Sequence, residues 1–596
     1  MRSARGRLWL GFSVLLLGAA CRTDRPIQRV LEARLKSLAD LGKPDLSSDD
    51  LRQALARQLR ATPKGAKEGP GAAKPAFPTR NTLQDFYADN AYRLAWFEDT
   101  GRSRPSSKIF LEALRRAGEH GLDPEDYYLS DLQRRQERIG KAPLDESAAT
   151  SLADFDLLMT SSFFRYASDL STGRVHPDEI RNDWRTNPPD LDVLKMLGQA
   201  LRTNKLPELL ESLPPPQADY ARLREGLREL REIKAAGGWP VIPAGPELRP
   251  GSRGERVSLL RRRLAERAGG KGGSRPASAA GDRFDASLSE SVRRFQERHG
   301  IEPDGKLNSP TLAALNVPVD ERIRQVELNL ERWRWIPRQL GDPHVLVNIA
   351  GFRLELVRQG NSVWRTRIVV GKAYSPTPVF SDRIVAIIAN PPWNVPEGIA
   401  VHEYVPELQK DPRALERDGI RLLKGSGEDP VEIDPATVDW RSIDDKGEFP
   451  FRLRQDPGPD NALGRLKFQL TNDFQIYLHD TPAKSLFDQS DRDLSHGCIR
   501  VEKPLELAQQ ILDDSSRPLL SEALQKTEER DLPVKPPVSI HILYLTAWAG
   551  EEGLLHFAQD IYDLDGPQAA AIQQASLQNS KPPSSARPPS QDASGQ

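Results

Sequence analysis

"DLSHGCIRVEKP" (residues 493–504) contains one of only two cysteines in a chain of 596 residues. If its GCIRV part is an extended strand, side chains alternate, so Cys498 and Arg500 share one face while Ile499 and Val501 face the core. The proline that closes the stretch favours the first turn of a helix, which the following "PLELAQQIL" can continue. The sequence therefore predicts a strand that presents a thiol and a guanidinium together, followed by a packing helix.

A second predicted strand carries groups that can act on this thiol. In "FQIYLHDTP" (residues 474–482) the same alternation puts Gln475, Tyr477 and His479 on one face. A thiol near pH 7 is mostly protonated and is activated by an adjacent imidazole. The residues alone leave two candidate bases, His479 on the other strand and His496, two positions before the cysteine.

The residues around the cysteine favour chemistry over packing. A free cysteine commonly behaves as a small buried hydrophobe, which is the simpler interpretation. Gly497, however, removes a side chain next to the thiol, so backbone N–H groups can approach a reacting carbonyl oxygen. We therefore interpret Cys498 as a nucleophile.

The N-terminus accounts for the other cysteine. Three arginines precede an apolar stretch that is too short to span a bilayer, and small residues then lead to Cys21. Residues 1–20 are therefore predicted to be a signal peptide, and the segment resembles a bacterial lipoprotein signal, in which the cysteine carries lipid. Gly18 stands where that signal usually has leucine, so secretion without lipid is the alternative. We expect an exported, periplasmic protein anchored to a membrane through Cys21.

Composition narrows the remaining possibilities. The chain is about twice as long as the roughly 250 to 300 residues at which single cores stop growing, which predicts several domains. The formal net charge is -1 with no long run of either sign, so a nucleic-acid partner is not expected. Two distant cysteines provide neither a disulfide framework nor a thiolate metal cage.

The patterns predict a multidomain α+β protein. Residues 21–80 are interpreted as a stalk and linker, and residues 81–235 as a helical domain. Residues 248–318 are predicted to form a small three-helix module, in which Ser309 caps a helix that begins at Pro310.

Strand alternation begins near residue 344, which predicts a β-rich domain over residues 344–548. A charged stretch with little strand alternation, about 396–464, interrupts it. We interpret this stretch as an inserted cap, with a long surface loop as the alternative. Residues 566–596 are predicted to be a disordered tail.

The three-helix module resembles the peptidoglycan-binding domain family. The matching residues are glycines and apolar positions in its first half, and a Phe-Gln pair with a Gly-x₃-Asp-Gly segment in its second half: Gly251, Gly254, Val257, Leu260, Phe295, Gln296, Gly300, Asp304 and Gly305. The resemblance implies that the module binds peptidoglycan.

"HDT" (479–481) and "SHGCIR" (495–500) resemble the two signature segments of the L,D-transpeptidases with a YkuD-type catalytic domain. The resemblance implies Cys498 as nucleophile and His479 as general base, held by the backbone carbonyl of Asp480. His496 and Gly497 complete the motif. The candidates for substrate contacts are Tyr477 with backbone N–H groups at the oxyanion, Arg500 at a carboxylate, Ser495, and Trp393, which either lines the cleft or belongs to the core.

The implied reaction is attack by Cys498 on a peptidoglycan tetrapeptide stem, release of D-Ala, and transfer of the thioester to an amine to form a 3-3 cross-link. An L,D-carboxypeptidase, which uses water as the acceptor, shares every catalytic residue. A non-catalytic, wall-binding lipoprotein is a further alternative. No cofactor is expected, and no metal, because His402, His541 and His556 stand apart without the usual partners.

Overall fold

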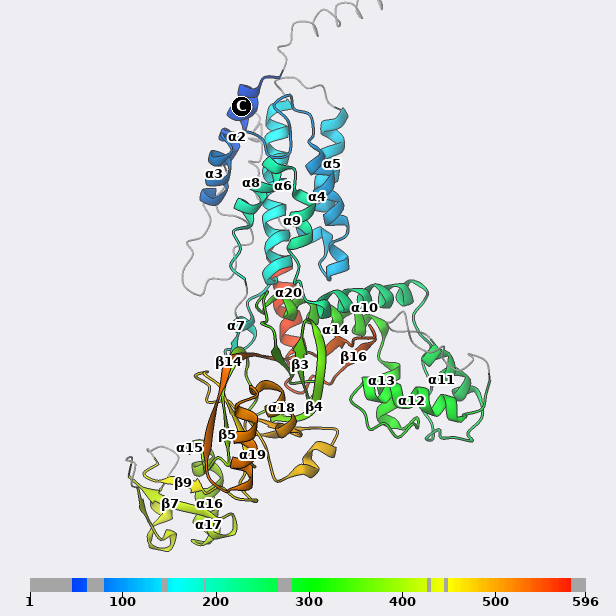
Figure 1. The fold of residues 1–596 in the computed structure, drawn as a ribbon. Helices are drawn as coiled ribbons and strands as arrows, with labels where there is room; N and C mark the ends of the chain where they lie inside the picture. The colour runs from blue at the N-terminus through cyan, green and yellow to red at the C-terminus, as the bar shows by residue number, and fades with distance from the viewer. Residues whose placement is uncertain are drawn as a thin grey trace, which may run out of the picture.

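The computed structural model describes residues 46–61, 80–141, 148–186, 189–265, 281–425, 430–443 and 449–579. Figure 1 shows three parts around two neighbouring helices, α10 (Ala218–Ala235) and α14 (Val319–Arg334): a long helical bundle, a small helical module and a β-rich domain. The predicted multidomain α+β class is confirmed.

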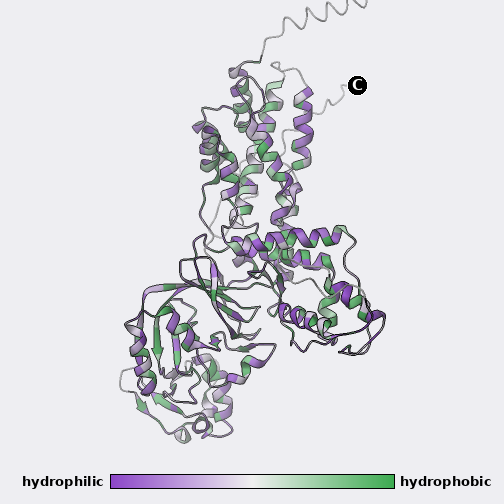
Figure 2. Ribbon diagram, turned by 45° about the vertical axis from the view of Figure 1, so that its right-hand side comes forward, coloured by the Kyte–Doolittle hydropathy of each residue, from purple (hydrophilic) through white to green (hydrophobic). Residues whose placement is uncertain are grey.

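The helical bundle surrounds one long helix, α6 (Ala148–Thr172), whose residues are buried on most sides. Its other helices are α2 (Ser48–Ala61), α3 (Arg80–Asp89), α4 (Pro105–Arg115), α5 (Leu129–Lys141), α8 (Val193–Thr203) and α9 (Leu206–Ser212). Figure 2 shows hydrophobic residues concentrated where these helices face one another. The apolar stripes of amphipathic helices form a common core in this way.

The prediction of a stalk up to residue 80 is wrong for α2. Leu51, Leu55 and Leu59 are buried in the bundle core, because their spacing places all three on the side of α2 that packs against α6. The predicted signal peptide, Cys21 and nearly all of the predicted linker lie outside the described residues. In the part of the chain that is described, none of the helices combines the length and the apolar character that crossing a membrane requires.

The small module consists of α11 (Glu255–Ala265), α12 (Ala286–Arg298) and α13 (Ser309–Asn316) around their own core. Gln296 is fully buried and donates to Asp304 and Thr311 while it accepts from the Gly305 N–H. The predicted cap is shifted by one residue. Asn308, rather than Ser309, caps α13, because its carboxamide oxygen accepts from the Thr311 N–H.

Helix α10 was assigned to the helical domain from sequence, but its apolar side packs elsewhere. Tyr220, Leu223 and Leu227 share a core with α14 and with the hairpin β15 (Ala547–Ala549) and β16 (Leu555–Phe557). The two long helices therefore connect the bundle to the β-rich domain.

The β-rich domain is built on one sheet that closes on itself. Its order is β5-β10-β11-β13-β4-β3-β2-β14, and β14 pairs with β5 as well as with β2. The strands are β2 (His344–Asn348), β3 (Arg353–Arg358), β4 (Asn361–Gly371), β5 (Val379–Ala389), β10 (Leu466–Gln469), β11 (Leu478–His479), β13 (Ile499–Val501) and β14 (Arg530–Leu543). Short strands β1 (Trp184–Arg185) and β12 (Asp493–Ser495) flank β5 and β4. The helix predicted after the cysteine is α18 (Pro504–Ile511), which packs on the core together with α19 (Ser516–Gln525).

The insertion has a fold of its own, with more strand than its sequence suggested. A small antiparallel sheet has the order β6-β9-β7-β8. Its strands are β6 (Trp393–Asn394), β7 (Ile420–Lys424), β8 (Val431–Glu432) and β9 (Arg452–Gln455), and its short helices are α15 (Glu397–Ile399), α16 (Val405–Leu408) and α17 (Ala414–Arg417). These elements enclose a separate hydrophobic core, which favours a folded cap over a surface loop.

The tail prediction is wrong at its start. Residues 565–579 form helix α20 (Asp565–Asn579), which packs beside α14. Its alanine, glutamine and leucine residues favour helix, and the helix buries Gln568 completely and Ile572 almost completely. Residues 580–596 lie outside the described part.

Candidate active site

The two strands that carry the motif residues are direct neighbours. β11 and β13 pair in parallel, with Leu478 opposite Ile499 and His479 opposite Arg500. Both Leu478 and Ile499 are fully buried. Residues opposite one another in a pair point to the same face, and faces alternate along each strand. Tyr477, His479, Cys498 and Arg500 therefore form a group on the other face, which we call the reactive face.

His479 is held in one orientation by its own chain. Its Nδ1 lies 2.5 Å from the carbonyl oxygen of Asp480, and a carbonyl can only accept, so Nδ1 carries the proton. In the neutral ring Nε2 is then free to accept a proton. The Asp480 carboxylate fixes this segment by accepting from the N–H groups of Arg465 and Thr481 and from Lys484.

Burial keeps the imidazole neutral. The pKa of His479 is lowered to about 3, first because the ring is buried and second because the Arg500 guanidinium lies beside it. Near neutral pH the ring is therefore a proton acceptor and carries no charge.

The thiol of Cys498 is half-buried and lies beside Tyr477, which precedes the paired strand β11. Burial raises the thiol pKa, although the backbone and hydroxyl of Tyr477 donate toward the sulfur and Lys467 and Arg500 contribute positive charge. The resting pair is therefore a neutral thiol and a neutral imidazole. The thiol donates to the backbone carbonyl of Gln475, with the sulfur 4.0 Å from the oxygen.

The turn before Cys498 depends on glycine. Gly497 has φ +105°, in the region that side chains rarely adopt, and an added Cβ would lie 3.3 Å from Ile476 Cδ1. Ser495 is buried, and its hydroxyl donates to the Cys498 carbonyl at 2.6 Å while it accepts from the Gly497 N–H at 3.3 Å. Ser495 thus shapes the turn, which corrects our prediction that it contacts substrate.

Two cations border the reactive face. Arg500 is half-buried, and its buried Nε has no hydrogen-bond partner. Lys467, on β10, lies opposite His479, and its Nζ is 4.2 Å from the centroid of the Tyr477 ring. Among the described residues, no carboxylate forms an ion pair with either cation. Two unpaired, partly desolvated cations suit a ligand that brings negative charge.

Sequence reasoning missed Lys467. The alternation in "LKFQL" (466–470) could have placed it on the face opposite the buried Leu466 and Phe468. Its position beside His479 depends on the pairing of β10 with β11, which the sequence does not contain.

The other motif histidine turns toward the insertion. His496 Nε2 lies 2.5 Å from Oε1 of Glu403, a residue of the inserted cap that sequence reasoning also missed. Trp393 is half-buried and packs against the core of the cap, which is the second of the two roles considered for it. In the described ranges no group of three or more histidine, cysteine, aspartate or glutamate side chains is arranged to hold a metal ion.

Comparisons with known proteins agree with this organisation. Three family models match: a "Scaffold domain" at residues 81–227, a "Putative peptidoglycan binding domain" at 253–315 and an "L,D-transpeptidase catalytic domain" of the YkuD type at 342–538. The chain therefore carries a scaffold domain, a peptidoglycan-binding domain and a YkuD-type L,D-transpeptidase catalytic domain, in that order.

A relative from Haemophilus influenzae named "Putative L,D-transpeptidase" is 34% identical over 246 residues, which are 41% of this chain and 48% of the relative. The chain thus spans about half the length of the curated relative it matches. An L,D-transpeptidase structure from Xylanimonas cellulosilytica is 15% identical, with 50% of this chain and 98% of that chain covered and a TM-score of 0.16. One from Stackebrandtia nassauensis is 14% identical, with 51% and 96% covered and a TM-score of 0.20.

Proposed function

We propose that this protein is a cysteine-dependent L,D-transpeptidase that acts on peptidoglycan tetrapeptide stems and forms 3-3 cross-links. One observation carries the proposal: Tyr477, His479, Cys498 and Arg500 share one face of two paired strands, with the acceptor nitrogen of His479 left free by the bond to Asp480. The catalytic-domain and peptidoglycan-binding matches support the substrate class.

In the first half-reaction the Cys498 sulfur attacks the carbonyl carbon that joins the L-centre of diaminopimelate to D-Ala. His479 Nε2 takes the thiol proton as the C–S bond forms, and the Tyr477 hydroxyl and the Cys498 N–H donate to the developing oxyanion. The C–N bond then breaks, the imidazolium returns the proton to the leaving amine, and D-Ala departs. A thioester remains.

In the second half-reaction an amine of a neighbouring stem attacks the thioester. His479 removes a proton from this amine and then returns it to the Cys498 sulfur, which regenerates the resting pair. Arg500 and Lys467 are suited to hold carboxylates of the stems, because both cations lie on the reactive face without a carboxylate of the chain paired to them.

The test uses purified protein and disaccharide-tetrapeptide muropeptides, with products identified by mass spectrometry. We expect 3-3 dimers and free D-Ala from the wild type. For Cys498→Ala we expect a loss on the order of 10⁴-fold or more, because no other group can form the thioester. Equal product from the two proteins would refute the proposal. Tripeptide without dimer, even with an added amine acceptor, would identify an L,D-carboxypeptidase, and binding without turnover would identify a wall-binding protein.

We further propose export through residues 1–20 and anchoring through lipid on Cys21. Cell fractionation with Cys21→Ser tests the anchor. We expect the variant in the soluble periplasmic fraction and the wild type in membranes, and identical fractionation of the two would refute lipid anchoring.

A further inference from the structure

The segment that runs from the last residue of β4 toward β5, residues 371–377, lies against the peptide that precedes Cys498, and we call it the loop. The Thr377 hydroxyl donates to the Gly497 carbonyl at 2.7 Å and accepts from the Gly371 N–H at 2.9 Å. Gly371 is needed for this fit, because an added Cβ would lie 2.3 Å from the Ser375 carbonyl oxygen. The loop therefore contacts Gly497 through one buried side chain.

Tyr562 fixes this loop from the other end of the chain. Its hydroxyl donates to the Gly371 carbonyl at 2.5 Å and accepts from the Thr377 N–H at 3.2 Å. Burial raises the pKa of Tyr562 to about 12, so the hydroxyl remains a donor near neutral pH. Tyr562 lies beyond residues 342–538, to which the catalytic-domain family model matches.

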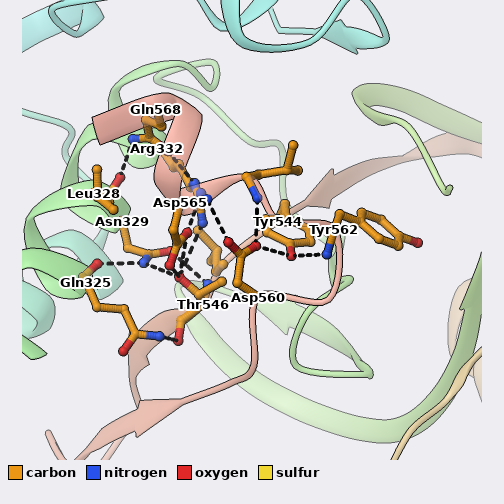
Figure 3. A network of polar contacts seen from close by, with 12 residues as sticks. Gln325, Leu328, Asn329, Arg332, Tyr544, Thr546, Asp560, Tyr562, Asp565 and Gln568 are labelled. Carbon is orange, nitrogen blue, oxygen red and sulfur yellow. Dashed lines mark hydrogen bonds and ion pairs between the residues drawn. The ribbon is translucent and has the colours of Figure 1, made fainter. Parts of the chain in front are cut away.

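Tyr562 is itself held by a polar network between α14 and the C-terminal segment (Figure 3). Its backbone N–H donates to the Tyr544 hydroxyl, which donates to Asp560 at 2.6 Å. Asp560 also accepts from the Asp565 N–H, and the Asp565 carboxylate pairs with Arg332 of α14 at 2.6 Å. The Tyr562 ring also stacks on Tyr544, with centroids 5.3 Å apart.

We infer that Thr377 and Tyr562 are positioning residues that aim the Cys498 N–H at the oxyanion. The Gly497 carbonyl and the Cys498 N–H belong to one planar peptide unit, in which they point in opposite directions. A hydrogen bond that fixes the carbonyl therefore also fixes the N–H. The constraint matters here because Gly497, at φ +105°, leaves this peptide free to rotate with little steric resistance.

This inference rests on the proposed function, and its tests separate the two. Thr377→Val removes the donor to Gly497, Thr377→Ser keeps it, and Tyr562→Phe removes only the hydroxyl that holds the loop. Tyr374→Phe is the matched control, because this tyrosine belongs to the same loop but is 74% exposed. Each variant is prepared as the full chain, and its melting temperature is recorded.

The measurements are single-turnover acylation by a tetrapeptide muropeptide and alkylation of Cys498 by iodoacetamide. Acylation develops an oxyanion and alkylation does not. We expect acylation to fall about 30-fold in Thr377→Val and about 5-fold in Tyr562→Phe, which is less than the 10²- to 10³-fold typical for loss of a whole oxyanion donor. Thr377→Ser and Tyr374→Phe should acylate like the wild type, and all variants should alkylate at the wild-type rate.

Unchanged acylation in Thr377→Val, with an active wild type, would overturn the inference and leave the proposed function intact. Alkylation that falls in parallel with acylation would also overturn it, because the residues would then support the thiol or the fold generally. A wild type that forms no acyl-enzyme at all would instead refute the proposed function.

Discussion

Arg332, in the joint where α14 packs beside α20, is buried, whereas Arg500 on the reactive face is half-buried, and the partners of the two guanidinium groups differ. Arg332 is 4% exposed and donates to Asp565 at 2.6 Å, to Gln568 at 2.8 Å and to Thr546 at 3.3 Å. Arg500 has a buried Nε without a partner and no paired carboxylate among the described residues. A buried guanidinium whose donors all have partners stabilises the fold around it. A buried donor without a partner is costly to the fold and requires another explanation, such as a bound ligand.

The polar groups around the two arginines differ in the same way as the arginines themselves. In the joint, the side chain of Asn329 donates to the Thr546 hydroxyl and accepts from the Thr546 N–H, and the Gln568 carboxamide donates to the backbone carbonyl of Leu328 in α14 (Figure 3). On the reactive face, the ammonium of Lys467 lies over the ring of Tyr477 and forms no ion pair with any carboxylate of the described residues. The comparison indicates that the joint supplies stability and that the reactive face retains unused hydrogen-bonding capacity for substrate.

The largest expected effect is a loss of stability when Arg332 in the joint is replaced. Arg332→Met should lower the free energy of unfolding by about 3 to 5 kcal/mol, because it leaves the Asp565 carboxylate without its ion pair. Urea denaturation measures this, with Arg324→Met, an exposed position of the same helix, as the control expected within about 0.5 kcal/mol of wild type. A loss as small as that of the control would mean that the joint is not a stabilising element.

For Arg500→Met we expect a loss of activity with little loss of stability. We expect kcat/KM for tetrapeptide stems to fall about 100-fold, equivalent to about 2.7 kcal/mol, because a substrate carboxylate loses its charged donor. Thermal unfolding should change little, since no ion pair of the chain is broken. Lys503→Met, which removes an exposed charge nearby, should keep wild-type activity. A large loss of stability in Arg500→Met would contradict the division between the two regions.

A smaller effect is expected for Lys467→Met. Loss of one cation beside Tyr477 should slow acylation about 10-fold, which corresponds to about 1.4 kcal/mol, while Lys467→Arg should retain most of the rate. Lys424→Met, on an exposed position of the cap, is the control. An unchanged acylation rate in Lys467→Met would remove this lysine from the site.

The smallest change is predicted for the rate of acylation as the pH is varied. Because the pKa of His479 is about 3 and burial raises the pKa of Cys498, the neutral pair persists across the middle of the pH range. Single-turnover acylation should therefore be flat between about pH 5 and about pH 8, and should be lost only as His479 protonates at lower pH. A decline centred near pH 6.5, where an ordinary histidine titrates, would instead show that burial does not lower the pKa of His479.

Much of the fold was predictable where the alternation of a strand or the apolar stripe of a helix is visible within a single element. Alternation along the two motif strands correctly predicted that Leu478, Ile499 and Val501 enter the core, and helical stripes correctly predicted the three-helix module. The errors arose where packing partners are distant in sequence. Helix α2 was separated from α6, and α20 was treated as part of a disordered tail, because neither short helix reveals what covers it.

The sequence by itself placed Tyr477, His479, Cys498 and Arg500 on one face and a glycine before the thiol, because the two-residue period of a strand and the conformational freedom of Gly497 are local properties. Only the tertiary structure decided that Lys467 lies beside His479, that Glu403 bonds to His496 and that the Tyr562 hydroxyl bonds to Gly371. These contacts join residues that are 93 and 191 positions apart for Glu403 and Tyr562, and residues on two different strands for Lys467. Strand pairing and side-chain packing bring such segments together, and neither leaves a periodic signal in the chain.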